Sequence, residues 1–205
     1  MAVAQPINGA LRRLPAGAIY IVSAIYAGWE FWRALNQLGP YLVEPINVLE
    51  RTYGEIALIM LVVGLTVTPL RKWTGINLLK FRRAIGLSAF FFVLAHFLVF
   101  AVLDVQSVSR VWEEVVKRPY VTVGMASFLM LIPLALTSNN LSLRKLGAAS
   151  WRKLHKLTYP AAVLGALHYL WLVKGFQIEP IIYLMAILAL VATRYLTLER
   201  KRQVA

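Results

Sequence analysis

Residues 151–171, WRKLHKLTYPAAVLGALHYLW, change character over the length of one helix. The segment begins with basic residues, becomes apolar enough for lipid, and carries the two histidines His155 and His168. Runs of about 20 mostly apolar residues are typical of transmembrane helices. The stretch therefore predicts a helix that leaves a basic aqueous surface and enters a membrane.

The whole composition extends this pattern. Apolar residues make up 60% of the 205 residues and charged residues only 15%, and the mean hydropathy is +0.66. These values are too apolar for a soluble domain and predict a polytopic membrane protein. We expect an all-α bundle of six transmembrane helices that forms a single domain over residues 1–205. The expected spans are residues 16–32, 54–70, 84–103, 121–137, 157–173 and 180–198.

The net charge of +13 follows a membrane topology. If the N-terminus is cytoplasmic, the inside segments hold 16 of the 22 basic residues, and the outside segments hold eight of the nine acidic residues. This is the partition that the positive-inside rule predicts. The charge therefore indicates cytoplasmic N- and C-termini and contact with anionic lipid headgroups, and it does not indicate nucleic-acid binding. The inside basic residues are Arg12, Arg13, Arg71, Lys72, Lys80, Arg82, Arg83, Arg144, Lys145, Arg152, Lys153, Lys156, Arg194, Arg200, Lys201 and Arg202.

Residues 16–32 also resemble a secretory signal, because Arg12 and Arg13 precede the apolar run. The length of the run and the lack of a clear small-x-small cleavage site argue for a retained helix. Trp29 and Trp32 lie where an interfacial aromatic belt is expected. We therefore count this segment as the first span.

Several chemistries are excluded by the residue types present. The chain has no cysteine, so it can form no disulfide, cysteine-ligated iron–sulfur cluster or thiolate zinc site. No G-x-G-x-x-G motif follows a strand pattern, no G-x-x-x-x-G-K-[ST] motif occurs, and no loop could hold a nucleotide-binding domain. Any reducing equivalents must therefore come from outside the chain.

Two ionisable residues lie well inside predicted spans: His96 in FFFVLAHFLVF and His168 in VLGALHYLWLV. Such residues are costly in lipid and are functional candidates, although a histidine can also join helices through a hydrogen bond. At 1.5 Å per residue, His96 lies about 20 Å above Arg83, and His168 lies about 20 Å above His155. Two imidazoles at one level on separate helices suit the two axial positions of a heme iron.

A bare metal ion fits this pattern less well. Two histidines without a cysteine or carboxylate at their depth make a poor zinc or iron site, whereas heme needs only axial nitrogens. Small residues near both histidines would leave room for a flat macrocycle, and ordinary close packing of helices is the alternative explanation. These residues are Ala161, Ala162, Gly165 and Ala166 below His168, and Ala84, Gly86 and Ser88 below His96.

Several stretches carry a resemblance to a known family: FRRAIGLSAFFFVLAH, RPYVTVGMASFLMLIPLALTS, RKLG, WRKLHKLTYP and LHYLWLVK. Over roughly residues 15–200, the chain resembles the heme-binding membrane subunits of bacterial periplasmic methionine sulfoxide reductase systems. These subunits belong to the ferric-reductase-like transmembrane family. The resemblance implies heme b held between His96 and His168 in the bacterial inner membrane. It also implies FMN as a further cofactor, which we can place on no residue.

The sequence departs from the family pattern at one point. Two stacked hemes need four ligands, and the position of the fourth holds Arg82 and Arg83, which cannot ligate iron. Arg82 points within about 40° of the direction of His96 on an ideal helix and could bind a heme propionate or a flavin phosphate. The number of hemes, one or two, therefore stays open. His155 is either a lone axial ligand or a polar contact in a basic loop.

His155 and His168 pose a geometric difficulty. Thirteen residues turn a straight helix by about 220°, so the two histidines should not share a face. Pro160 lies between them and offers two solutions. Either the helix begins near Thr158 with His155 on a preceding turn, or the helix axis bends at the proline.

The resulting hypothesis is a non-catalytic electron-transfer subunit. The resemblance implies that electrons come from membrane quinol, with a soluble flavin reductase as the competing donor, and pass to a periplasmic molybdopterin enzyme that repairs oxidised methionine in proteins. The loop of residues 104–120, with Glu113 and Glu114, and the short loop around Glu179 are the expected docking surface. Two alternatives are a ferric or other metal reductase, and a small transporter in which His96 and His168 carry protons.

Overall fold

The computed structural model describes residues 4–173 and 175–203, with side chains as far as Arg194. Arg200, Lys201 and Arg202, which the charge argument uses, lie beyond the described side chains. The described chain is helical and contains no strand, which confirms the all-α class. The helices are α1 (Ala4–Arg13), α2 (Ala18–Leu35), α3 (Pro45–Thr74), α4 (Arg82–Leu98), α5 (Val108–Lys117), α6 (Pro119–Leu136), α7 (Asn140–Leu154), α8 (Thr158–Leu172) and α9 (Ile178–Gln203), with short 3-10 turns at Gly39–Tyr41, Leu79–Phe81 and His155–Leu157 and a π-helix, η3, at Val99–Asp104.

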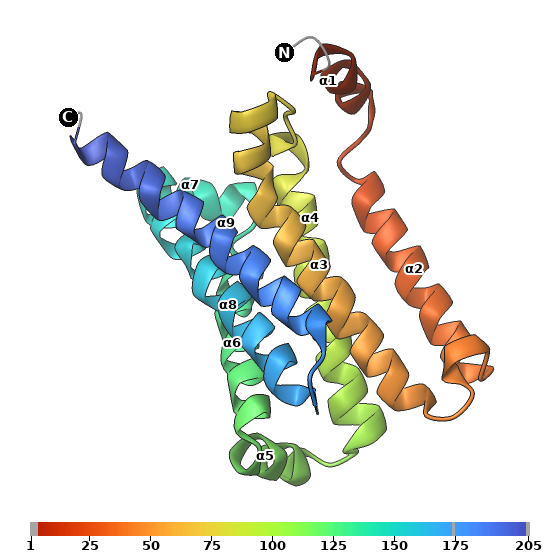
Figure 1. Cartoon of the computed structure of the whole chain (residues 1–205). Coiled ribbons are helices and arrows are strands. Elements are labelled where there is room, and N and C mark those ends of the chain that lie inside the picture. The colour runs from red at the N-terminus through yellow and green to blue at the C-terminus, as the bar shows by residue number, and fades with distance from the viewer. Residues whose placement is uncertain (1–3, 174, 204–205) are drawn as a thin grey trace.

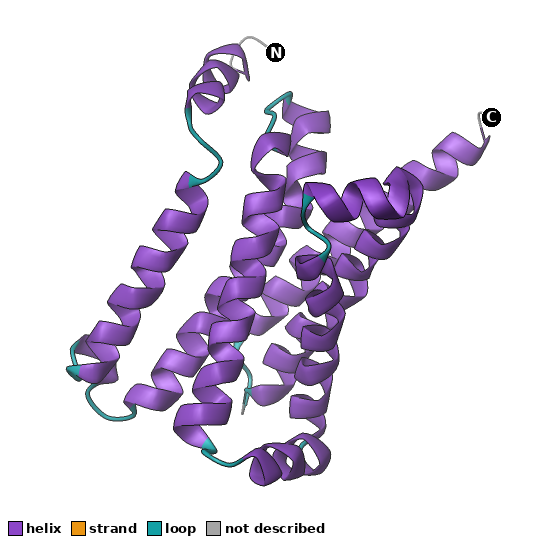
Figure 2. Cartoon of the chain, turned by 180° about the vertical axis from the view of Figure 1, so that it is seen from behind, coloured by secondary structure: helices purple, strands orange, loops and turns teal. Residues whose placement is uncertain are grey.

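Helices α3, α4, α6 and α8 form the centre of the molecule (Figures 1 and 2). The closest pairs are α3 with α4 and α6 with α8, while α9 packs on both α3 and α8. Helix α2 lies on the far side of α3 and α4, and α5 lies across one end of the bundle. Helix α1, helix α7 and the C-terminal part of α9 lie at the opposite end (Figure 1). We refer to the first of these ends as the α5 end.

Among the described residues, three helical segments are long and apolar enough to cross a membrane: Pro45–Thr74, Leu79–Asp104 and Pro119–Leu136. They contain the second and third of the predicted spans and all but the last residue of the fourth. The other predicted spans coincide with α2, α8 and α9, of which α8 has only 15 residues. The membrane assignment therefore has direct support, while the count of six spans stays a prediction.

Two segments that the sequence analysis treated as loops are amphipathic helices. Helix α5 places Val108, Trp112 and Val116 one turn apart, and all three side chains are exposed. Helix α7 is interrupted at Gly147, where a positive φ of 74° departs from helical geometry. Both helices carry many charges, so an argument based on long apolar runs does not find them.

The start of α8 answers the question about Pro160. His155–Leu157 form a 3-10 turn, and α8 begins at Thr158. The proline thus lies in the first turn of the helix. Backbone N–H groups in this turn have no intrahelical acceptor, so a residue without an N–H costs no helical hydrogen bond there. Of the two solutions open to the sequence, the structure adopts the helix start, with His155 on a separate turn.

The outer surfaces of the helices are apolar. Ile21 and Ile25 on α2 are 62% and 66% exposed, and Leu129 on α6 and Met185 on α9 are 58% and 61% exposed. Soluble proteins rarely expose apolar patches this extensive, so these surfaces suit contact with lipid. The core lies between the helices, where it includes the fully buried Ala89, Ala161, Ala162 and Ala166.

Candidate functional site

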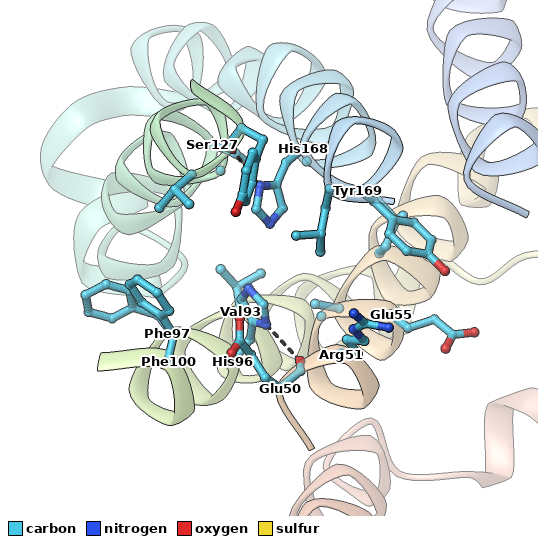
Figure 3. Close-up of a pocket in the computed structure, with 18 of the residues that line it drawn as sticks. Glu50, Arg51, Glu55, Val93, His96, Phe97, Phe100, Ser127, His168 and Tyr169 are labelled. Atoms are coloured by element: carbon cyan, nitrogen blue, oxygen red, sulfur yellow. Dashed lines mark hydrogen bonds between the residues drawn. The ribbon is translucent and has the colours of Figure 1, made fainter. Parts of the chain in front are cut away.

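A cavity of about 650 Å³ lies between α3, α4, α6 and α8, in the half of the bundle nearest the α5 end. Both His96 and His168 line it, and Figure 3 shows the two rings pointing toward each other from opposite walls. Apolar side chains such as Leu58, Leu61 and Val93 line the cavity as well. The sequence prediction that the two histidines share one level is therefore confirmed.

His96 is positioned by helix α3. Its Nδ1 atom lies 2.8 Å from the carbonyl oxygen of Glu50. Gly54 follows Glu50 by one helical turn, and a Cβ atom added to it would lie 3.1 Å from the same Nδ1 atom. The absence of a side chain at Gly54 thus lets the imidazole reach the backbone of α3.

His168 is positioned in the same way by helix α6. Its Nδ1 atom lies 2.7 Å from the carbonyl oxygen of Tyr120. Gly124 follows Tyr120 by one turn, and a Cβ atom there would lie only 2.8 Å from Nδ1 and 3.0 Å from Cε1 of the ring. The cavity therefore has two matching halves, each with a histidine, a carbonyl group and a glycine four residues after that carbonyl.

These two hydrogen bonds determine the tautomer of each ring. A carbonyl oxygen only accepts hydrogen bonds, so Nδ1 of each neutral imidazole must carry the proton and donate it. The lone pair then resides on Nε2 in both His96 and His168. Backbone contacts of this kind orient metal-binding histidines and raise their basicity as ligands.

The spacing of the rings suits one metal between them. The ring centroids of His96 and His168 lie 6.1 Å apart, with 71° between the ring planes. A metal–imidazole bond of about 2 Å, with the nitrogen roughly 1 Å from the ring centre, gives a separation of about 6 Å for two rings on opposite sides of one metal. The two rings can therefore act as axial ligands without a change of helix positions.

The surroundings suit a flat aromatic macrocycle. Phe97 on α4 and Phe128 on α6 stack with ring centroids 5.0 Å apart at one side of the cavity. Within the described residues, no three His, Asp or Glu side chains gather to bind a bare ion. Two facing imidazoles beside aromatic and aliphatic side chains are the donor set that heme requires, so the residues present fit a heme.

A π-helix begins three residues after His96. In η3 (Val99–Asp104), the N–H groups of Val105 and Gln106 bond to carbonyls five residues earlier, at 2.9 and 3.1 Å. The wider turn carries Phe100 and Asp104 into the cavity lining. Single π-turns inside helices occur often at functional sites, and the sequence analysis did not predict this one.

His155 lies outside the cavity. Its Nε2 atom is 3.2 Å from the hydroxyl of Thr137, and its ring stacks on Trp151 with centroids 3.8 Å apart. Trp151 donates a hydrogen bond to the carbonyl of Thr137, which closes a small polar cluster. Burial, with the nearby positive charge of Arg82, lowers the pKa of His155 below its ordinary value.

Arg82 and Arg83 also lie outside the cavity lining. Both stand at the first turn of α4, at the end of the bundle opposite α5. Arg83 donates a hydrogen bond to the side chain of Asn140 at the start of α7. The structure thus brings His96 and His168 together and leaves His155, Arg82 and Arg83 near the other end.

Side chains fill the bundle between these two levels. Leu61, Ala89, Leu131, Leu134 and Ala161 form one buried cluster across α3, α4, α6 and α8. Of the small residues proposed as room for a macrocycle, Ala161 belongs to this cluster, and Ala162 and Ala166 belong to a second buried cluster with Leu58, Leu65 and Ile187. Only Gly165 of that set lines the cavity.

Sequence reasoning missed the residues that orient the histidines. Glu50 and Gly54, like Tyr120 and Gly124, are spaced i and i+4 on helices that contain neither histidine. Glycines inside predicted spans were a visible signal, because they permit close approach of a neighbouring helix. Which histidine they face depends on helix packing, which the spacing does not reveal.

Comparisons with known proteins show the family of this chain. Residues 53–166 match the model of the family described as ferric reductase like transmembrane component. The chain is 43% identical over 177 residues to a protein of Brucella anthropi named protein-methionine-sulfoxide reductase heme-binding subunit MsrQ, with 86% of this chain and 79% of the relative covered. Proteins of the same name from Brucella ovis and Brucella canis are 44% identical over 178 residues, with the same coverage.

Proposed function

Because this chain belongs to the ferric-reductase-like transmembrane family and to the MsrQ family of heme-binding subunits, we propose that it is a membrane electron-transfer subunit. In this proposal, His96 and His168 would hold one heme b in the cavity between α3, α4, α6 and α8. The observation that carries the proposal is the pair of facing imidazoles, 6.1 Å apart between centroids.

The protein's own contribution is to hold two neutral imidazoles in place. The carbonyls of Glu50 and Tyr120 fix each ring with Nε2 directed away from the backbone. Heme held by His96 and His168 would supply single-electron transfer. Because both imidazoles would be used to hold the heme, the proposed role of the chain is electron transfer and not bond chemistry.

The partners are the finer part of the proposal. We expect electrons from membrane quinol, with a soluble flavin reductase at the basic surface as the competing donor. The acceptor is a periplasmic molybdopterin methionine sulfoxide reductase, and the location is the bacterial inner membrane. The names of the relatives support a partnership with a methionine sulfoxide reductase, whereas FMN has no assigned residue in this chain.

His155 has a different role in this proposal. Its Nε2 atom is engaged by Thr137, and its ring is stacked on Trp151. We therefore expect it to join α6, α7 and the start of α8, and not to ligate the heme between His96 and His168. The same reasoning favours one heme over two in the cavity.

The test is the heme content per polypeptide of the purified protein and three variants. His96→Ala and His168→Ala should each lose the heme, while His155→Ala should keep most of it. Visible spectra of the reduced protein provide the second readout, because a heme with two histidine ligands gives sharp bands. Full heme in either of the first two variants would contradict the assignment.

A second candidate function is reduction of a ferric chelate, which the matched family description favours. The cavity and the ligands would be the same, and only the acceptor would change. Mixing the reduced protein with a periplasmic methionine sulfoxide reductase or with a ferric chelate, and following reoxidation by absorbance, distinguishes the two. Faster reoxidation by the reductase supports the first function.

A further inference from the structure

The cavity has one apolar side and one polar side. Phe97 and Phe100 stand on one side, and Arg51 and Glu55 stand on the other (Figure 3). A second arginine, Arg118, lines the cavity from the residue that precedes α6. Both arginines lie at the α5 end, which the charge distribution predicts to be the outer side of the membrane.

Arg51 is placed to bind an anion in the cavity. It follows Glu50, whose carbonyl holds His96, so its position along α3 is tied to the level of the histidines. In the described part of the chain, its guanidinium forms no hydrogen bond or ion pair with a side chain at bonding distance. An arginine that lines a cavity and lacks such a partner can donate two parallel N–H groups to a carboxylate.

Arg118 retains donors as well. Its Nε atom pairs with Glu114 on α5, and one Nη atom is 3.4 Å from the hydroxyl of Tyr120. A guanidinium has five N–H donors, so further donors are available toward the cavity. Its pairing with α5 also limits the positions that the side chain can adopt.

The other charged groups at this rim are acidic. Glu50, Glu55 and Asp104 line the cavity, and the carboxyl of Glu50 interacts electrostatically with Asp104, Arg51 and Arg118. Without the two arginines, the rim would therefore repel an anion. The arginines decide whether a carboxylate can be held there.

Heme is an amphiphile with two carboxylates along one edge and apolar substituents along the rest. The cavity has a matching asymmetry, with aromatic rings on one side and arginines on the other. We propose that Arg51 and Arg118 bind the heme carboxylates at the α5 end and so set the rotational orientation of the macrocycle. This inference rests on the proposed function and names the groups that recognise the ligand's anionic edge. It replaces Arg82, which the sequence analysis considered for this role and which lies outside the cavity.

The test compares two porphyrins that differ only at their two carboxylates. Apoprotein in detergent is titrated with heme and with heme dimethyl ester, in which both carboxylates are blocked, and affinity is read from the absorption of the bound form. The variants are Arg51→Gln, Arg118→Gln and the double variant. Arg110→Gln on α5 is the matched control, because Arg110 lies at the same end of the molecule and does not line the cavity.

The wild type and the Arg110→Gln control should prefer heme over the diester. In each single variant, the ratio of the affinity for heme to the affinity for the diester should fall about tenfold. This matches the loss of one charge-assisted contact per arginine. The double variant should bind both porphyrins with similar affinity, and its retained diester binding would show that the cavity is intact. A double variant with the wild-type preference would overturn the assignment of the arginines. Failure of the wild type to bind either porphyrin would instead overturn the proposed function together with this inference.

Discussion

Gly54 and Gly124 determine how the two facing histidines are held, because each leaves the carbonyl oxygen one turn earlier open to a ring nitrogen. The space is tighter at Gly124, where an added Cβ atom would lie 2.8 Å from His168 Nδ1, than at Gly54, where it would lie 3.1 Å from His96 Nδ1. Each ring is also hydrogen-bonded through Nδ1 to a backbone carbonyl. A ring that moved away from an added Cβ atom would therefore lose that hydrogen bond.

We predict that Gly124→Ala lowers the heme content by more than half and that Gly54→Ala has a smaller effect in the same direction. Forcing a methyl group into such a space costs about 1–3 kcal/mol, and here the cost falls on the orientation of the axial ligand. Heme per polypeptide and the reduced spectrum are the measurements. Gly86→Ala on α4 is the control, because a Cβ atom at that position would meet nothing within 4 Å, and it should keep full heme. Equal heme content in all three variants would show that the glycines do not position the rings.

At the scale of elements, α2 is the outlying helix and depends on a polar network at the α5 end. Glu30 on α2 is 5% exposed and accepts hydrogen bonds from Arg33, at 3.0 Å, and from the Tyr41 hydroxyl, at 2.8 Å. Tyr53 on α3 donates to the carbonyl of Ala27 at 2.7 Å. The sequence alone does not predict that Glu30 is buried, since its burial depends on how the turn at Gly39–Tyr41 folds back.

Tyr41→Phe should loosen this attachment by about 1.5–3 kcal/mol, the usual contribution of a hydrogen bond to a charged group. Burial raises the pKa of Tyr41 from 10.0 to about 12, so the folded state holds the phenol proton more tightly than the unfolded state does. The stabilisation is thus complete below the unfolded pKa of 10 and is lost as the pH rises toward 12. Thermal unfolding across this alkaline range is the measurement.

In the Tyr41→Phe variant, stability should be lower at neutral pH and should decline less between these two pH values. Tyr20→Phe on α2 serves as the control, because Tyr20 is 40% exposed. An unchanged alkaline decline in Tyr41→Phe would assign that decline to other tyrosines.

At the scale of the whole molecule, the two ends of the bundle differ in charge and in the helices that cover them. Helix α5 caps the end that contains the cavity, and α1 and α7 lie at the other end (Figure 1). The basic residues of α7 and of the segment before α4 share this second end with Arg82 and Arg83. From this distribution of charge, the positive-inside rule predicts that the cavity lies in the outer half of the membrane.

Because the chain has no cysteine, single cysteines can report this orientation without a background signal. Ser109→Cys on α5 should react with a membrane-impermeant maleimide in cells with an opened outer membrane. Ser150→Cys on α7 should react only after the inner membrane is permeabilised. Both positions are exposed, and the unmodified chain is the control. Labelling in the reverse pattern would invert the topology and place the heme site on the cytoplasmic side.

The sequence alone determined the membrane class and the level of the two histidines. Both follow from local rules, because the length of an apolar run and the rise per residue along a helix do not depend on neighbouring helices. The same rules put His155 about 20 Å below His168. They also allowed α8 to begin near Thr158, and the helix does begin there.

Only the tertiary structure decided what surrounds each histidine. The carbonyls that orient His96 and His168 lie 46 and 48 residues away in the chain, and the rotation of one helix against another is set by side-chain packing. That packing filled the half of the bundle near His155, placed Arg82 outside the cavity, and brought Arg51 and Arg118 to its rim. Height along a helix is a property of the backbone, whereas the direction that a side chain faces is a property of the assembled bundle.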